Sequence, residues 1–370
     1  IKFTNNLKEI LKTDITFLTV GTPPTKKGEI DLSYVKQAIS SIIKILKTKK
    51  TKHTVVIKST VVPTTTTKII YPQFNKIKNI KVIVNPEFLR ESLAIQDLLK
   101  PHLIVIGEKK SGDGLELKKY YENFYKKCPE ILFTDLVTAE MIKYSNNAFL
   151  ATKISFINSI ANICQNIPDT DVKTITYAIG KDPRIGPLFL NAGPGFGGSC
   201  LPKDLSALID FLKKINNENL ILKSVKAIND DQPKKIINLI EKMGALKKRN
   251  TVSILGVAFK KNTDDIRESK SISLVKILLR NGIKIKVHDP MALNNFKEVF
   301  KNKIEYCDTI SNAILQSHCC IIMTGWDEYK NLKPNDFKKN MKKVNIIDAQ
   351  RILEHKKFKK LSFSAIGLGN

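Results

Sequence analysis

The chain has 370 residues, too many for one ordinary hydrophobic core, so we expect two or three domains. Its hydrophobic content of 42% and charged content of 26% are near globular averages, which favours a globular protein over a disordered or fibrous one. The net charge of +27 suggests nucleic-acid binding, but only six of the 62 basic residues are arginine, the better reader of phosphates and bases. We therefore expect no nucleic-acid partner, whereas attraction of a small polyanionic substrate stays open.

The N-terminal part alternates short runs rich in valine and isoleucine with helical patterns, which is typical of a parallel sheet. Between the first two runs, apolar residues recur at helical spacing over 32–46, and their polar far side predicts a helix that covers the sheet. The predicted strands are 15–20, 54–59, 81–84, 103–107 and 131–134.

A single long helix is predicted over 136–167, because this stretch contains no proline or glycine and keeps a helical apolar pattern until Pro168. At roughly 1.5 Å per residue such a helix crosses a whole domain. It is therefore a candidate spine between domains and a candidate dimer surface.

The segment 180–204 is rich in glycine and proline and too apolar for a linker, so we expect a structured binding loop. A linker is expected at 244–250, after a helix that ends near Met243. A second α/β domain then fills the C-terminal third. Its predicted strands are 252–255, 283–288, 319–324, 344–348 and 361–366.

Membrane, secretory and metal-binding patterns are missing from the sequence. The longest apolar stretches, such as 102–107 and 319–323, are far shorter than the roughly 20 residues of a membrane helix, and no secretory leader is recognisable. The six cysteines include no CxxC pair, and the five histidines have no metal-ligand spacing beside them. We expect a cytoplasmic protein with reduced cysteines, no metal and no membrane partner.

The start of the chain lacks a dinucleotide-binding fingerprint, because the first strand is followed by Gly21-Thr22-Pro23-Pro24. A formal GxGxxG occurs at Gly193, Gly195 and Gly198, but it leads into Ser199-Cys200-Leu201-Pro202 and not into an uninterrupted helix, so we reject it as a pyrophosphate site. We expect at least one further unit of about 30 residues before Ile1. The choice between NAD and NADP stays open on these residues.

Cys200 is the strongest catalytic candidate, because residues 195–204 place it with a lysine and a carboxylate behind glycines that let a ligand approach the backbone. An exposed, electropositive setting favours a nucleophilic thiolate over a buried structural cysteine. Lys143 and Asn147 are four residues apart on the long helix, so both side chains point from one face and could stabilise one oxyanion. The alternative for this pair is a solvated helix surface.

Polar residues also end one predicted strand, at 58–60, and follow another, at 85–91, and doubly wound folds bind ligands at these carboxyl ends. For Glu87 and Glu91 the alternative is a pair of carboxylates favoured by a helix dipole.

Six motifs in this order resemble the UDP-glucose/GDP-mannose dehydrogenase family, and together they span essentially the whole chain. They are FLTVGTPP (17–24), KSTV (58–61), NPEFLRE (85–91), AEMIKYSNNAF (139–149), GGSCLPKD (197–204) and NTDDIRES (262–269). The resemblance implies an α/β fold with two Rossmann-like parallel-sheet domains, joined by a long central helix and a helical dimerisation region. It implies an NAD-binding domain in 1–135, a central domain with the cysteine loop in 136–245, and a UDP-sugar-binding domain in 246–370.

The resemblance also assigns roles to residues. It implies a catalytic set with Cys200 as nucleophile, completed by Lys143, Asn147, Asp204, Glu87 and Thr60. Arg184 would reach the substrate across a homodimer. The implied substrate contacts are Phe88, Leu89, Arg184, Phe196, Gly197, Phe259, Lys260 and Arg351. The implied cofactor contacts are Thr22, Pro23, Thr60, Glu91, Lys203 and Arg267.

The expected reaction is the NAD-dependent, four-electron oxidation of UDP-glucose to UDP-glucuronate through a thiohemiacetal and a thioester on Cys200. Ser199 before the cysteine favours the UDP-glucose and GDP-mannose branch over N-acetylhexosamine members, which resemble Gly-Gly-His-Cys. The alternatives are a GDP-mannose or UDP-N-acetylhexosamine 6-dehydrogenase, or a sugar-nucleotide-binding protein without cofactor. One departure is Gln350 after Asp348-Ala349, where the family often has arginine, so the role of Arg351 is open.

Overall fold

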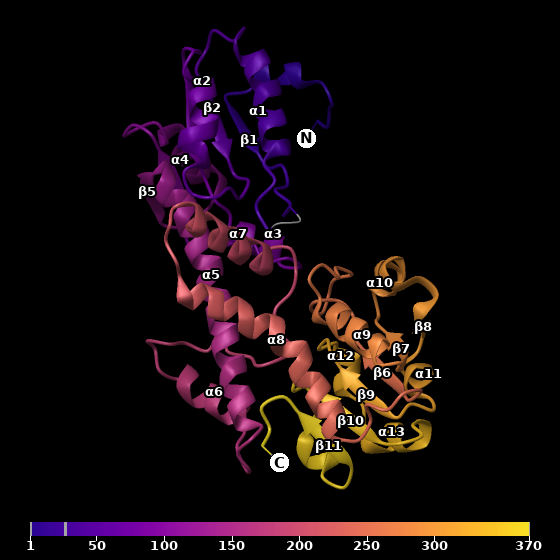
Figure 1. The fold of residues 1–370 in the computed structure, drawn as a ribbon. Helices are drawn as coiled ribbons and strands as arrows, with labels where there is room; N and C mark the ends of the chain where they lie inside the picture. The colour runs from indigo at the N-terminus through magenta and orange to yellow at the C-terminus, as the bar shows by residue number, and fades with distance from the viewer. Residues whose placement is uncertain (1, 26–27, 370) are drawn as a thin grey trace. The chain divides into compact units, whose positions relative to one another are not determined.

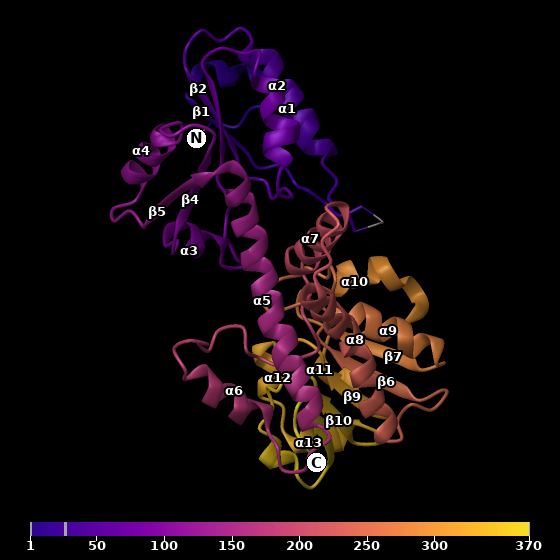
Figure 2. The same ribbon diagram turned by 60° about the vertical axis from the view of Figure 1, so that its left-hand side comes forward.

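The computed structural model describes residues 2–25 and 28–369, and these fall into two compact units. Unit 1 consists of residues 1–147 and 203–218, and unit 2 of residues 148–202 and 219–370. Figures 1 and 2 trace the chain from two directions. The chain passes from one unit to the other within helix α5 (Leu136–Cys164), within α7 (Leu201–Lys214) and just before α8 (Leu220–Lys242).

Unit 1 is built on a five-stranded sheet in the order β1-β2-β3-β4-β5, and all five strands lie where the sequence predicts them. Their bounds are β1 Ile15–Leu18, β2 His53–Ile57, β3 Ile80–Val84, β4 Ile104–Glu108 and β5 Ile131–Asp135. The remaining elements are η1 Leu7–Lys12, α1 Ser33–Leu46, the π-helix η2 Thr66–Ile70, α2 Tyr71–Phe74, α3 Ala94–Leu99 and α4 Leu115–Phe124.

The expectation of a fully parallel sheet is wrong at one junction, because β3 and β4 pair antiparallel at Val84 and Gly107. The segment 85–103 between these strands contains only the short helix α3, none of whose residues is buried. Parallel neighbouring strands need a crossover connection over one face of the sheet, usually a helix, and this segment does not provide one. β4 therefore runs in the direction opposite to β3. The other neighbours in this sheet pair parallel.

Both faces of the unit 1 sheet are covered, because side chains alternate between them along each strand. Val55 and Ile57 of β2 share one cluster with Ile39 of α1 and Phe74 of α2. Val56 points to the other face, where Leu117 and Tyr121 of α4 pack on β3 and β4. This is the three-layer arrangement expected of a doubly wound domain.

Unit 2 contains a six-stranded sheet in the order β11-β10-β9-β6-β7-β8, and all of its pairs are parallel. The chain leaves β6 toward β7 on one side and returns to β9 on the other. The order of the strands therefore reverses at β6, and ligands of open α/β sheets bind at such points, beside the carboxyl ends of the strands. The bounds are β6 Thr251–Leu255, β7 Lys284–His288, β8 Glu305–Tyr306, β9 Cys319–Ile322, β10 Asn345–Asp348 and β11 Ser362–Ala365.

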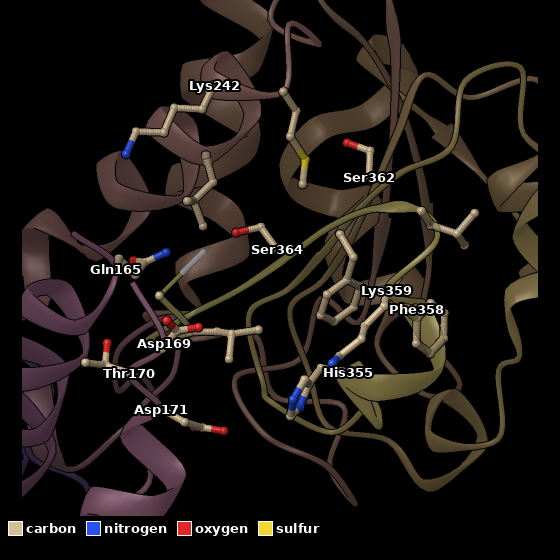
Figure 3. Close-up of a pocket in the computed structure, with 16 residues that line it drawn as sticks. Gln165, Asp169, Thr170, Asp171, Lys242, His355, Phe358, Lys359, Ser362 and Ser364 are labelled. Atoms are coloured by element: carbon tan, nitrogen blue, oxygen red, sulfur yellow. The ribbon is translucent and has the colours of Figure 1, made fainter. Parts of the chain in front are cut away.

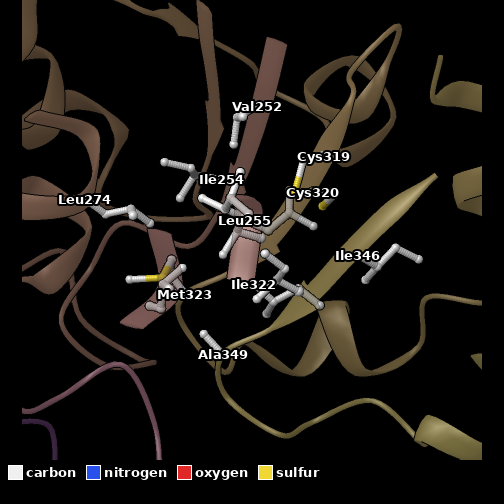
Figure 4. Close-up of a cluster of buried hydrophobic side chains, with 14 of the residues drawn as sticks. Val252, Ile254, Leu255, Leu274, Cys319, Cys320, Ile322, Met323, Ile346 and Ala349 are labelled. Atoms are coloured by element: carbon white, nitrogen blue, oxygen red, sulfur yellow. The ribbon is translucent and has the colours of Figure 1, made fainter. Parts of the chain in front are cut away.

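The core of unit 2 forms around the central strands (Figure 4). Val252 and Ile254 of β6 lie beside Cys319 and Cys320 of β9, and all four are buried. These two cysteines thus act as small apolar side chains, and burial raises the pKa of each thiol, as expected for cysteines without a chemical role. The helices of this unit outside the long ones are α6 Val172–Gly180, α9 Lys270–Arg280, α10 Leu293–Phe300, η3 Lys301–Lys303, α11 Ile310–Ile314, α12 Asp327–Lys330, α13 Pro334–Asn340 and η4 His355–Phe358.

The predicted long helix is confirmed as the 29 residues of α5, which ends three residues before the position that Pro168 suggested. The predicted irregular loop over 180–204 is correct for residues 181–200. It is wrong for Gly180, which ends α6, and for its last four residues, which form the first turn of α7. Pro202 fits there because a helix's first turn leaves its backbone N–H groups without intrahelical partners. None of the helices in the described part of the chain is long and apolar enough to cross a membrane.

Glu140 is an unusual residue on α5, because its carboxyl group is buried with only 2% of the residue exposed. One oxygen accepts a hydrogen bond of 2.8 Å from the backbone N–H of Thr66, and Oε2 has no hydrogen-bond partner within the described chain. Burial raises the pKa of Glu140 from 4.5 to about 7. Between these two values the folded protein keeps a proton that the unfolded chain has released, so its stability falls as the pH rises through this window.

We therefore expect the substitution Glu140→Gln to gain stability over the parent protein as the pH rises from 5 to 7, by an amount on the order of 3 kcal/mol at most. Urea unfolding at pH 5, 6, 7 and 8 measures this, with the exposed Glu122→Gln as control. Equal pH profiles for Glu140→Gln and its parent would contradict the burial argument.

Candidate active site

The candidate residues of unit 1 form two hydrogen-bonded pairs along one face of α5. Lys143 Nζ lies 3.0 Å from Glu87 Oε1, and Asn147 Nδ2 donates to Asp204 Oδ2 at 2.6 Å. Lys143, Asn147 and Asp204 are all buried. The i, i+4 spacing that the sequence suggested thus places a cation and an amide side by side, each with a carboxylate partner from another element.

Both carboxylates are held by further donors. Glu87 Oε2 accepts from the backbone N–H of Leu89 at 2.5 Å, and Asp204 Oδ1 accepts from Lys203 Nζ at 2.6 Å. The ammonium group of Lys143 lies 5.6 Å from the ring centre of Phe88, within cation–π range. Phe88, Leu89 and Lys203, which the sequence assigned to ligands, therefore lie in the same network as the catalytic candidates.

Lys58 belongs to this network, although the sequence gave it no role. Its Nζ donates to Asn85 Oδ1 at 3.0 Å, and Tyr121 donates to the same oxygen at 2.5 Å. Burial lowers the pKa of Lys58 to about 8, and Glu87 and Lys143 are the nearby charges that act on it. The sequence does place this lysine at the end of an apolar strand, two residues before Thr60. A charged side chain beside buried residues needs polar partners, so this position could have indicated a polar site.

The segment after β1 fits a dinucleotide in its chemistry. The Thr22 hydroxyl donates to the backbone oxygen of Thr60 at 2.9 Å, which joins the ends of β1 and β2. A Cβ added at Gly21 would meet open space, so a ligand can approach the backbone at this position. Backbone and hydroxyl groups around open space at the carboxyl ends of parallel strands suit the ribose and nicotinamide of NAD. Thr22, Pro23 and Thr60 would hold this end of the cofactor, as the sequence suggested.

Cys200 is exposed in unit 2, whereas the other five cysteines are buried or half-buried. It stands directly before α7, and the Ser199 hydroxyl lies 3.6 Å from its sulfur. A cysteine at a helix N-terminus, reachable by solvent, meets the structural conditions for a nucleophile.

The glycines before Cys200 are required by close packing. A Cβ at Gly197 would lie 2.6 Å from the backbone oxygen of Glu268, and one at Gly198 would lie 2.7 Å from the ring of Phe259. Gly198 also has a φ of 83°, which favours glycine. Its N–H donates to the backbone oxygen of Arg267 at 2.8 Å. The cysteine loop is thus packed against the segment 259–268 that follows β6.

The substrate candidates Phe259 and Lys260 lie in that segment, at the carboxyl end of β6, where the strand order reverses. Asp289 holds the two residues that lead into this segment, because its Oδ2 accepts hydrogen bonds from the backbone N–H groups of Val257 and Ala258 at 2.7 and 3.0 Å. Arg267 is exposed and paired with Asp265 at 2.7 Å. The proposed ligand side chains therefore stand on a rigidly held loop.

Two other substrate candidates have different environments. The Arg351 guanidinium is buried, bonded to Asp171 at 2.7 Å and to the backbone oxygen of Ile366 at 3.0 Å. Arg351 also lines a cavity of about 590 Å³ with Asn191, Ala192, Gln350 and residues of α6. The Arg184 side chain is exposed and is paired with Asp182 at 2.6 Å. Phe196 is buried, so it contributes packing and backbone groups and not an exposed ring.

A further cavity of about 770 Å³ lies at the C-terminal end of α5 (Figure 3). Asp169, Lys242, His355 and Ser364 are among its lining residues, and none of the sequence-predicted site residues is. Within residues 2–25 and 28–369, no group of three or more histidine, cysteine, aspartate or glutamate residues is placed to hold a metal ion.

Comparison with known protein families identifies three consecutive domains of one family. Residues 1–125 match the NAD-binding domain of the UDP-glucose/GDP-mannose dehydrogenase family, residues 137–231 its central domain, and residues 253–356 its UDP-binding domain. The chain belongs to this family. It is therefore an NAD-dependent nucleotide-sugar dehydrogenase by family, its cofactor is NAD, and its C-terminal domain binds UDP.

Individual relatives agree with this assignment. The chain is 40% identical to a UDP-glucose 6-dehydrogenase of Rickettsia bellii, over 100% of this chain and 85% of the relative. It is 38% identical to a UDP-glucose 6-dehydrogenase of Haloferax volcanii, over 95% and 83%. The solved structure of a UDP-glucose dehydrogenase from Pyrobaculum islandicum is 34% identical with a TM-score of 0.90, and covers 99% of this chain and 83% of that one. A UDP-D-ManNAc dehydrogenase from Pyrococcus horikoshii, at 23% identity and a TM-score of 0.84, shares the fold.

Proposed function

We propose that this protein oxidises UDP-glucose to UDP-glucuronate, with Cys200 as the covalent catalyst. The observation that carries the proposal is the exposed Cys200 at the start of α7, a helix whose Asp204 is hydrogen-bonded to Asn147 of α5. Its relatives of 38 to 40% identity named UDP-glucose 6-dehydrogenase support the choice of sugar. The matched domains support a division into 1–135, 136–245 and 246–370.

The proposed reaction has two oxidations on one carbon. The primary alcohol at C6 first loses a proton and a hydride and becomes an aldehyde. The thiolate of Cys200 then attacks the aldehyde carbon, which forms a C–S bond and moves the carbonyl π electrons onto oxygen. The resulting thiohemiacetal oxyanion re-forms the C=O bond as it loses a second hydride, which leaves a thioester. Water cleaves the C–S bond and releases the carboxylate and the thiolate. NAD, when bound, accepts one hydride in each oxidation, so two NADH form per sugar.

The paired groups on α5 have complementary tasks in this scheme. Lys143 and Asn147 donate to the oxygen that becomes negative in the thiohemiacetal and in the hydrolysis step, and such preorganised donors usually make the largest contribution to catalysis. Asp204 and Glu87 hold these donors in place and accept protons from the alcohol and from water. Thr60, whose backbone oxygen accepts a hydrogen bond from the Thr22 hydroxyl, is the remaining member of the proposed catalytic set.

The sugar preference is proposed from residues beside the nucleophile. Ser199 is small, and the segments 182–187 and 189–193 resemble those of UDP-glucose enzymes. A pocket shaped for one sugar leaves buried polar groups unpaired when another sugar enters, so we expect discrimination of roughly a hundredfold or more in kcat/KM.

The test is NADH production by the full-length enzyme with UDP-glucose, GDP-mannose, UDP-GlcNAc and UDP-ManNAc supplied separately. UDP-glucose should be fastest. A higher kcat/KM for any of the other three would refute the substrate assignment and leave the family membership intact.

We also propose that the protein forms a homodimer through α5. Phe149, Phe156 and Ile163 follow one another at intervals of seven residues, so they form a stripe on one side of the helix, and they are 66%, 50% and 54% exposed. An exposed apolar stripe of this kind is typical of an association surface. Within such a dimer, the exposed Arg184 of one subunit would contact the substrate of the other.

Replacing one residue of this stripe tests the dimer. Phe156→Glu places a charge in the middle of the proposed interface, so we expect monomers at micromolar concentration in sedimentation experiments. Leu115→Glu on α4, at an equally exposed apolar position in unit 1, is the control and should leave the mass unchanged. A dimer that persists in Phe156→Glu would contradict this interface.

A further inference from the structure

Asn229 of α8 holds the backbone of the cysteine loop from one side. Its Oδ1 accepts from the backbone N–H of Phe196 at 2.7 Å, and its Nδ2 donates to the backbone oxygen of the same residue at 3.1 Å. Asn229 is only 3% exposed, and both hydrogen bonds are buried. A carboxamide is the neutral side-chain group that offers one acceptor and one donor in this arrangement.

The loop packs closely against Asn229 and against the segment 259–268. A Cβ at Gly195 would lie 2.7 Å from Asn229 Oδ1, and the φ of 104° at this glycine is open to few other residues. On the opposite side, Gly197 and Gly198 pack against the segment 259–268. The loop therefore lies between α8 and the segment that bears Phe259 and Lys260. Phe196, which Asn229 binds, is four residues before Cys200.

We propose that Asn229 is a positioning residue that sets the place of Cys200 relative to the nucleotide-binding segment 259–268. The inference rests on the proposed function, in which Cys200 must meet the sugar of a substrate that Phe259 and Lys260 contact. Asn229 does not touch the reacting atoms. It acts through Phe196, whose backbone position determines where the following residues of the loop begin.

Loss of the carboxamide leaves two buried backbone groups without partners. In Asn229→Ala the N–H and C=O of Phe196 have no replacement, so the loop should open toward water to satisfy them. Misplacement of a reacting group by about 1 Å lowers turnover by up to a hundredfold. We therefore expect kcat to fall by roughly that factor, while KM for the nucleotide sugar changes less than about threefold.

Asn229→Asp is the more specific variant, because its charge state decides whether it can replace the amide. An ionised carboxylate accepts from the Phe196 N–H but faces the Phe196 carbonyl with a second acceptor, whereas a protonated carboxyl has one donor and one acceptor, like the amide. The charged groups on the surrounding elements are Asp230 and Lys226 on α8, Lys270 on α9, and Arg267 and Glu268 in the segment after Phe259.

The experiment measures kcat of Asn229→Asp relative to the parent enzyme between pH 5 and 9. We expect a low ratio at pH 8 to 9 that rises at least fivefold toward pH 5, as the buried carboxyl takes up a proton. Ser155→Ala is the matched control, because Ser155 Oγ donates a buried hydrogen bond of 2.9 Å to the backbone oxygen of Val225 on the same helix α8. The ratio of kcat in Ser155→Ala to kcat in the parent should not change with pH.

Hydrogen exchange of the peptide around Phe196 gives a readout that needs no substrate. We expect the Phe196 amide to exchange at least ten times faster in Asn229→Ala than in the parent and in Ser155→Ala. Unchanged exchange, or a flat pH ratio for Asn229→Asp, would overturn the positioning role. Failure of the proposed function is recognised separately, since the parent enzyme would then form no NADH from UDP-glucose while the exchange result still reports on the loop.

Discussion

Replacing Cys200 with serine is expected to lower acid formation by three orders of magnitude or more, because the oxyester that a serine would form is made through a much weaker nucleophile than a thiolate. The substitution changes one exposed atom, so sugar-nucleotide affinity should stay within about threefold of the parent value. Product formation followed by mass spectrometry, together with calorimetric titration of UDP-glucose, measures both quantities.

Serine substitution of another cysteine provides the control for this experiment. Cys128 is half-buried in unit 1 and lies outside the candidate network, so Cys128→Ser should keep normal turnover. Normal turnover in Cys200→Ser would remove this residue from the mechanism and would require another nucleophile or direct hydration of the aldehyde.

Replacing Lys143 with methionine is expected to lower kcat by a factor of about a hundred to a thousand, the usual result of removing one donor to a developing oxyanion. Lys143 is buried, and its ammonium group is the partner of Glu87 at 3.0 Å. Removing the ammonium group therefore also deprives the Glu87 carboxylate of this partner, and Lys58 is then the lysine that still acts on it. Steady-state kinetics with saturating NAD should show the effect mainly in kcat, because the donor acts most strongly in the transition state.

Two further variants separate the role of Lys143 from a general effect of charge. Lys143→Arg keeps the charge but not the compact shape of the ammonium group, so it should restore little activity. Lys118→Met removes a lysine from an exposed pair on α4 and should leave the kinetics unchanged. A kcat in Lys143→Met within threefold of the parent would contradict the assignment of this residue.

The strands and the long helix of this fold were predictable because their signals are local. Valine and isoleucine runs such as 54–57 form buried strands, and the absence of proline and glycine over 136–164 allows one helix. The direction of β4 was not predictable in the same way. It depends on whether the segment 85–103 crosses a face of the sheet, which is decided by tertiary packing and not by the pattern of any one element.

The candidate site shows the same limit. The i, i+4 spacing of Lys143 and Asn147 is readable in the sequence, but their partners Glu87 and Asp204 come from distant segments that only the fold brings to α5. Lys58 received no individual role and Asn229 was not singled out, because neither type of residue is rare. Their importance comes from burial and from the groups that they contact, and neither is encoded in local spacing.

The number of NADH molecules formed per UDP-glucose tests most directly whether one carbon is oxidised twice through Cys200. The full-length enzyme is incubated with excess NAD and a limiting, known amount of UDP-glucose until the absorbance of NADH is constant. The product is then identified from its mass by mass spectrometry. The proposed function predicts two NADH per sugar and UDP-glucuronate as the product. One NADH per sugar with a free aldehyde, or no NADH from UDP-glucose, would contradict it.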